Sequence, residues 1–165
     1  MEVITSESLD AFVLATVPCA LKNMGAHFSP YGEAYILGFL RRHLRSDSTS
    51  PDSASFLGLT DDDLRTIRTT YEKSQRSSGK LLLLGEHCLL TAGFFPDFVE
   101  SRHVPHNMHA YAQIGIAAYA RAHDLFADNS PTPTASTPYL EVAVQFAPTA
   151  RALQEVYNKS RVLFD

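Results

Sequence analysis

The chain has 165 residues, of which 45% are hydrophobic and 19% charged, and its formal net charge at pH 7 is −4. Such a composition predicts one soluble globular domain over residues 1–165. The acidic balance makes nucleic acid an unexpected partner, because duplex binding usually requires a basic surface. No stretch reaches the roughly 20 apolar residues that span a membrane, so we expect no membrane partner either.

The two cysteines, Cys19 and Cys88, both lie in apolar segments that we predict to be helical. Two cysteines in a chain of this length do not resemble a secreted disulfide framework, so we expect buried free thiols in a reducing compartment. The N-terminal stretch MEVITSESLD contains no basic residue, which is unlike a secretory signal. These features predict a cytoplasmic protein.

Apolar residues recur at helical spacing throughout, and no run alternates with a period of two, so we predict an all-α fold of about six helices. The first helix covers about 8–24, where Pro18 predicts a kink or a break. The second has Ser29 as its N-cap and Pro30 in its first helical position, and it runs to Arg45.

The segment 46–56 is polar and rich in serine, which predicts a flexible linker. The third helix follows it: Thr60 is the expected N-cap, and Asp61–Asp63 occupy the first turn beside the positive end of the helix dipole. Its narrow apolar stripe, which includes Ile67, predicts a helix on the surface of the domain.

The fourth and fifth helices, at about 80–95 and 106–126, are long and apolar, and we expect them to form the centre of the bundle. The fifth carries small residues on one face, which would let a neighbouring helix approach closely. A second linker, rich in proline, is predicted near 127–138. The last helix runs from about 138 to 163, and Pro148 predicts a kink or an interruption in it.

Glu86 is the most informative polar residue, because leucines surround it on the fourth helix. A buried carboxylate needs a hydrogen-bond partner, since burial disfavours its charge. We identify Tyr35, Tyr111 and Tyr119 as candidate partners, because each stands in an otherwise apolar stripe. A structural role for Glu86 is favoured, and a catalytic role remains the alternative. The neighbouring His87 points about 100° away on the helix, so these two residues alone cannot form one site.

The segment HVPHNMH contains His103, His106 and His109, of which the last two share a face at the start of the fifth helix. Imidazole is a common transition-metal ligand, so these residues are candidates for a metal site. The chain contains no HExxH motif and no pair of cysteines spaced as zinc ligands, and we therefore predict no cofactor.

The second helix ends in three arginines, Arg41, Arg42 and Arg45, which complement the negative end of the helix dipole. If these side chains remain in solvent, they form a basic surface that a partner protein can bind. We therefore treat them as a candidate binding surface.

The fourth and fifth helices resemble an uncharacterised family of small all-helical bacterial proteins. The family has a leucine-rich helix with the pattern LGD-x-x-L-x-x-AGFFP and a later helix with Y-x-x-x-G-x-x-AY. The matching residues are Leu84, Gly85, Leu89, Ala92, Gly93, Phe94, Phe95, Pro96, Tyr111, Gly115, Ala118 and Tyr119. Glu86 occupies the acidic position of this pattern, whereas His87 and Cys88 lie outside it. The resemblance implies an all-helical fold and an acidic residue at 86, but no activity.

Taken together, these features predict a small soluble bacterial helical protein that acts as a non-enzymatic regulator or adaptor. Its expected partner is another protein or a second copy of itself. The alternative is a helical metal- or haem-binding protein, with or without enzymatic activity, that uses the histidines at 103, 106 and 109, with Glu86 as a further candidate.

Overall fold

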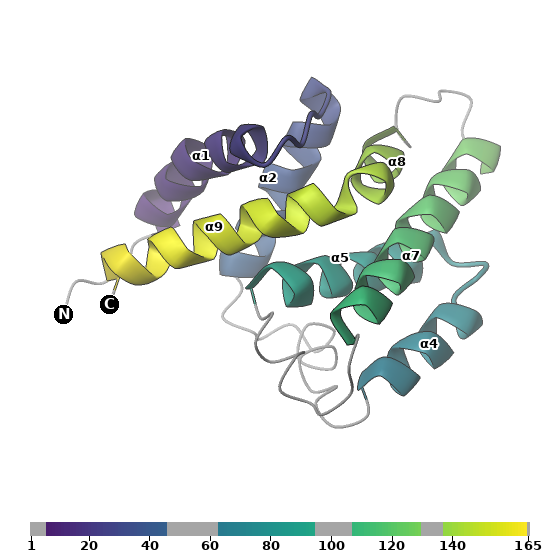
Figure 1. Ribbon diagram of the computed structural model, residues 1–165. Helices are drawn as coiled ribbons and strands as arrows, with labels where there is room; N and C mark the ends of the chain where they lie inside the picture. Colours follow the sequence, from purple (N-terminus) through teal and green to yellow (C-terminus); the bar gives the residue numbers. More distant parts are fainter. Residues whose placement is uncertain (1–5, 46–62, 95–106, 130–136, 165) are drawn as a thin grey trace.

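The computed structural model describes residues 6–45, 63–94, 107–129 and 137–164, and within these ranges the fold is all-α, as predicted (Figure 1). These residues form seven helices and contain no strand. The helices are α1 (Ser6–Asn23), α2 (Pro30–Arg45), α4 (Asp63–Lys73), α5 (Ser78–Phe94), α7 (Asn107–Asn129), α8 (Thr137–Val144) and α9 (Phe146–Phe164).

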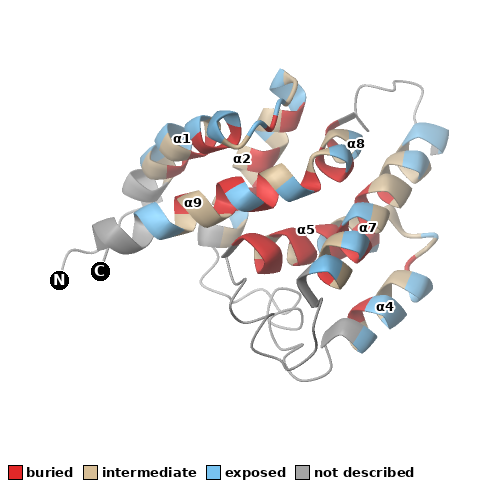
Figure 2. Ribbon diagram, viewed as in Figure 1, coloured by how far each residue is buried: buried red, intermediate tan, exposed pale blue. Residues whose placement is uncertain are grey.

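Helices α5 and α7 form the centre of the bundle, and they share the most extensive contact in the described fold. Helix α9 packs against both α1 and α5, while α8 packs against α2 and α7 (Figure 1). Buried residues cover most of α5, as expected for a helix that is apolar on nearly all sides (Figure 2). Gly115 of α7 allows the close approach: a Cβ atom there would lie 2.9 Å from the Cβ of Cys88.

A Schellman motif ends α1 and turns the chain toward α2. Gly25 has a φ of 76°, a left-handed conformation that glycine adopts without a steric penalty. The amide of Ala26 donates to the carbonyl of Leu21 at 2.9 Å, and that of Gly25 donates to Lys22 at 3.1 Å. These two bonds satisfy carbonyls that the end of the helix would otherwise leave without a donor.

The predicted N-cap of α2 is confirmed, because the hydroxyl of Ser29 accepts a hydrogen bond from the amide of Gly32 at 3.2 Å. The carboxylate of Glu141 in α8 accepts from both the amide and the hydroxyl of Ser29, each at 2.8 Å. Gln145 pairs with both backbone groups of His27. The turn between α1 and α2 is therefore fixed by the segment that joins α8 and α9.

Of the predicted kink or break at Pro18, the break is wrong, because α1 is one helix from Ser6 to Asn23 that includes this proline. The kink stays a prediction. The packing of α1 against α2 and α9 outweighs the local cost of a proline in a helix. The last predicted helix is interrupted, but at Gln145 and not at Pro148. Pro148 lies in the first turn of α9, where its missing N–H would have no helical partner.

Two further expectations need correction. The predicted bounds of the linker near 127–138 are wrong at both ends, because α7 continues to Asn129 and α8 begins at Thr137. Residues 130–136 lie outside the described residues. Cys19 is exposed, so only Cys88 is a buried thiol, and burial raises the pKa of Cys88. Helix α1 turns only part of its surface toward α2 and α9, and Cys19 lies on the remaining part.

The predicted linker at 46–56 and the predicted cap at Thr60 lie outside the described residues. Within the described residues, the helices are too short or too polar for any of them to cross a bilayer.

Candidate functional site

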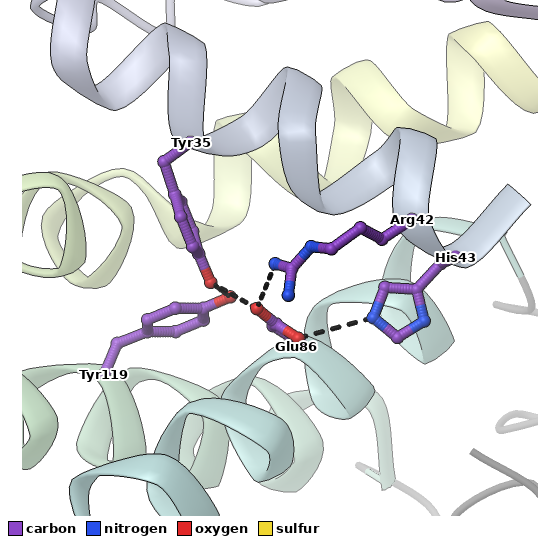
Figure 3. Close-up of polar contacts among 5 residues, drawn as sticks. All are labelled: Tyr35, Arg42, His43, Glu86 and Tyr119. Atoms are coloured by element: carbon purple, nitrogen blue, oxygen red, sulfur yellow. Dashed lines mark hydrogen bonds and ion pairs between the residues drawn. The ribbon is translucent and has the colours of Figure 1, made fainter. Parts of the chain in front are cut away.

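Glu86 of α5 lies among four side chains, three from α2 and one from α7 (Figure 3). The side chain of Glu86 is only 5% exposed. The hydroxyl of Tyr35 donates a hydrogen bond to its Oε1 at 2.8 Å. The hydroxyl of Tyr119 lies 3.0 Å from that of Tyr35. Because the proton of Tyr35 is engaged with Glu86, Tyr119 donates to Tyr35, and the three groups form a chain.

Two basic residues of α2 complete the surroundings of the carboxylate. A guanidinium nitrogen of Arg42 lies 3.2 Å from Oε1, and Nε2 of His43 lies 3.3 Å from Oε2 of Glu86. Both oxygens therefore have partners. The Arg42 side chain is 65% exposed, so the cluster extends from the core to the surface along this arginine. We call Tyr35, Arg42, His43, Glu86 and Tyr119 the Glu86 cluster.

The spacing along α2 explains how one helix provides three members of the cluster. Tyr35 and Arg42 are seven residues apart, which is two helical turns, and His43 follows Arg42 directly. Phe39 fills the turn between them, stacked on Tyr35 and edge-on to His43, with ring centroids 6.1 and 5.0 Å away. A continuous aromatic stripe therefore holds the polar groups of α2 against Glu86.

A glycine beside Glu86 makes room for Tyr119. A Cβ atom at Gly85 would lie 2.8 Å from two atoms of the Tyr119 ring, closer than side chains normally approach. The ring therefore lies directly on the backbone of α5, and its hydroxyl reaches Tyr35. A larger residue at position 85 would displace the ring from this position.

Burial raises the pKa of the two tyrosines beside Glu86. Burial, followed by the charge of Glu86, raises the pKa of Tyr119. Burial is also the largest cause that raises the pKa of Tyr35, ahead of the contributions of Tyr119 and Glu86. Both tyrosines therefore keep their protons at neutral pH and act as neutral donors.

His87 is adjacent to the cluster through His43. Burial, and then the charge of His43, lowers the pKa of His87 to about 4. Helix geometry separates Glu86 and His87 on α5, but His43 of α2 interacts with both. The sequence provided no sign of this role for His43, because it depends on where the fold places α2 relative to α5.

Three further predicted site residues, Tyr111, Arg41 and Arg45, are not among the five residues of the Glu86 cluster. Tyr111 is buried on α7, two turns before Tyr119. Arg41 pairs with Asp10 of α1 through two bonds of 3.1 and 3.2 Å, so it joins α1 to α2. Arg45 is the last residue of α2, and its side chain is not among those described.

His109 is exposed near the start of α7, whereas His103 and His106 lie outside the described residues. Among the described residues, no three His, Cys, Asp or Glu side chains lie together in a way that could hold a metal ion.

A groove between α1 and α9 is the second candidate site, and the sequence analysis missed it. Its volume is about 670 Å³, within the range typical of ligand sites. Its lining residues are Phe12, Thr16, Met24, Arg151, Gln154, Glu155, Asn158 and Lys159. The available signal was the polar series Arg151, Glu155 and Lys159, which recurs every four residues and therefore shares one face of α9.

Glu155 has partners for only one of its two oxygens. Oε1 accepts from Asn23 at 3.4 Å and lies 3.2 Å from the Nζ of Lys159. Oε2 is buried, and no described residue donates to it. A nearby polar residue, Gln154, donates to the carbonyl of Ala92 in the last turn of α5, which satisfies a group that the helix end leaves open.

No protein-family model, curated protein or solved structure matches this chain. Membership of the uncharacterised helical family therefore stays a prediction.

Proposed function

We propose that this chain is a non-enzymatic helical regulator or adaptor that binds another protein through the groove between α1 and α9. The observation that carries the proposal is the groove itself, in which Phe12 and Met24 provide apolar surface beside the cations Arg151 and Lys159. Binding energy in protein interfaces concentrates where a side chain of the partner fills such a pocket.

The Glu86 cluster supports the proposal indirectly, because its contacts indicate a structural role. Tyr35, Arg42 and His43 contact both oxygens of the carboxylate, and these residues belong to a different helix. In this arrangement the carboxylate joins α5 to α2 through side-chain contacts. We therefore assign the cluster to the scaffold and the groove to recognition.

Affinity capture with a groove-blocked variant tests the proposal. Thr16→Tyr places a neutral ring in the groove, while Arg68→Glu alters an exposed position of α4, which packs on α5 and α7. Wild type and Arg68→Glu should retain the same proteins from a lysate of the source cells, and Thr16→Tyr should lose at least one of them. If every retained protein is insensitive to Thr16→Tyr in a variant with wild-type circular dichroism, the groove is not the binding site.

A further inference from the structure

From the unpaired groups of the α1–α9 groove, we infer that the partner presents an apolar side chain next to an acidic one on a peptide segment. This inference rests on the proposed function and specifies the chemistry of the partner.

The first step concerns charge. Arg151 is exposed at the groove, and no described residue forms an ion pair with it. Lys159 is already paired with Glu155, at 3.2 Å. The groove therefore contains one cation in excess, in a chain whose formal net charge is −4. A carboxylate of the partner is the group that complements Arg151.

The second step concerns the buried acceptor, Oε2 of Glu155. A buried carboxylate oxygen without a donor is unfavourable. The Glu155 side chain is 23% exposed, so a rotation of its carboxylate presents this oxygen to a ligand N–H, which removes the cost. A fatty acid offers a carboxylate and an apolar chain but no donor. A peptide offers all three groups within adjacent residues: a backbone N–H, an apolar side chain and an acidic side chain.

The third step concerns the apolar surface. Phe12 and Met24 are only partly buried, and both line the groove. Both belong to the segment of α1 and its following turn that faces α9. A leucine-sized side chain of the partner would bury this surface and leave the acidic neighbour at Arg151 near the rim.

The test is a charge exchange measured by fluorescence anisotropy. The probe is a short fluorescein-labelled peptide with leucines flanked by glutamates, and the matched control has lysines in place of the glutamates. The wild type should bind the glutamate peptide, Arg151→Glu should weaken this binding about tenfold, and Arg68→Glu should leave it within about twofold. Arg151→Glu should also bind the lysine peptide better than the wild type does.

A third peptide, methylated at the leucine amides, tests the donor to Glu155. Methylation should weaken binding to the wild type about tenfold and should have a smaller effect on Glu155→Ala, which lacks the acceptor. Equal losses in both proteins would overturn the role of Oε2.

The remaining outcomes separate this inference from the proposed function. Equal binding of both peptides to the wild type, or decanoate displacing the peptide at equal affinity, would overturn the inference. So would an Arg151-dependent dimer in light scattering, because the occupant would then be a second copy of the chain. If a protein captured in a Thr16-dependent manner binds through a basic segment, the inference fails while the proposed function stands.

Discussion

Two glutamates of this protein differ in how their buried carboxylate oxygens are satisfied: Glu86 in α5 is buried, and Glu155 in α9 is partly exposed. Glu86 has hydrogen-bonding or ionic partners at both oxygens, and all of them come from α2. Glu155 has partners at Oε1 only, and its buried Oε2 has no donor among the described residues. A carboxylate between packed helices can be satisfied by the protein itself, whereas one beside an open groove can be satisfied by a partner.

The largest expected effect comes from removing the satisfied carboxylate. Glu86→Ala should lower the free energy of unfolding by about 3 kcal/mol, because it leaves the hydroxyl of Tyr35 without its acceptor and creates a cavity where the buried Glu86 side chain was. Urea denaturation followed by far-UV circular dichroism measures this change. A loss below about 1 kcal/mol would mean that the cluster contributes little to stability.

The second prediction concerns the close contact that positions Tyr119. Gly85→Ala should lower the free energy of unfolding by about 2 kcal/mol, because the new Cβ would overlap the Tyr119 ring. Gly38→Ala is the matched control, since no heavy atom lies within 4 Å of a Cβ there. This control should stabilise α2 by up to about 1 kcal/mol in the same urea titration. Equal effects of the two substitutions would contradict the proposed packing.

A third prediction uses acid to test the surroundings of the cluster. The pKa of His87 falls from its ordinary value of 6.5 to about 4 in the fold, so the folded state favours the neutral ring. The associated stability is present above pH 6.5 and is lost as the pH falls toward 4. Between pH 7 and about 5.5, the loss should be about 1 kcal/mol.

Urea denaturation at both pH values, with His87→Gln as the comparison, isolates this contribution. The variant should lose much less stability over the same interval, because its side chain does not titrate. An identical loss in the two proteins would assign the acid sensitivity to another group.

The smallest expected effect comes from removing Glu155, the glutamate whose buried oxygen has no donor among the described residues. Glu155→Ala should change the free energy of unfolding by no more than about 0.5 kcal/mol, because the lost pair with Lys159 is offset by the removal of an unsatisfied acceptor. Thermal unfolding followed by circular dichroism is sufficient to measure it. A loss as large as that of Glu86→Ala would show that the two carboxylates have equivalent roles.

Much of the helical architecture is determined by local sequence. Ser29 and Pro30 predict the start of α2 correctly, because a cap depends on a few adjacent residues. The apolar periodicity of α5 and α7 predicts the central pair for the same reason. It also indicates that Glu86 needs a partner, and it includes Tyr35 among the candidates.

The tertiary structure decided the rest, because contacts between helices depend on crossing geometry that no local pattern contains. His43 and Arg42 reach Glu86 only because the packing of α2 against α1 and α8 places these side chains beside α5. The continuity of α1 through Pro18 depends on its neighbours. The α1–α9 groove combines residues that are more than 100 positions apart in the sequence. No local stretch of the sequence therefore reveals that Glu155 lines the same groove as Phe12 and Met24.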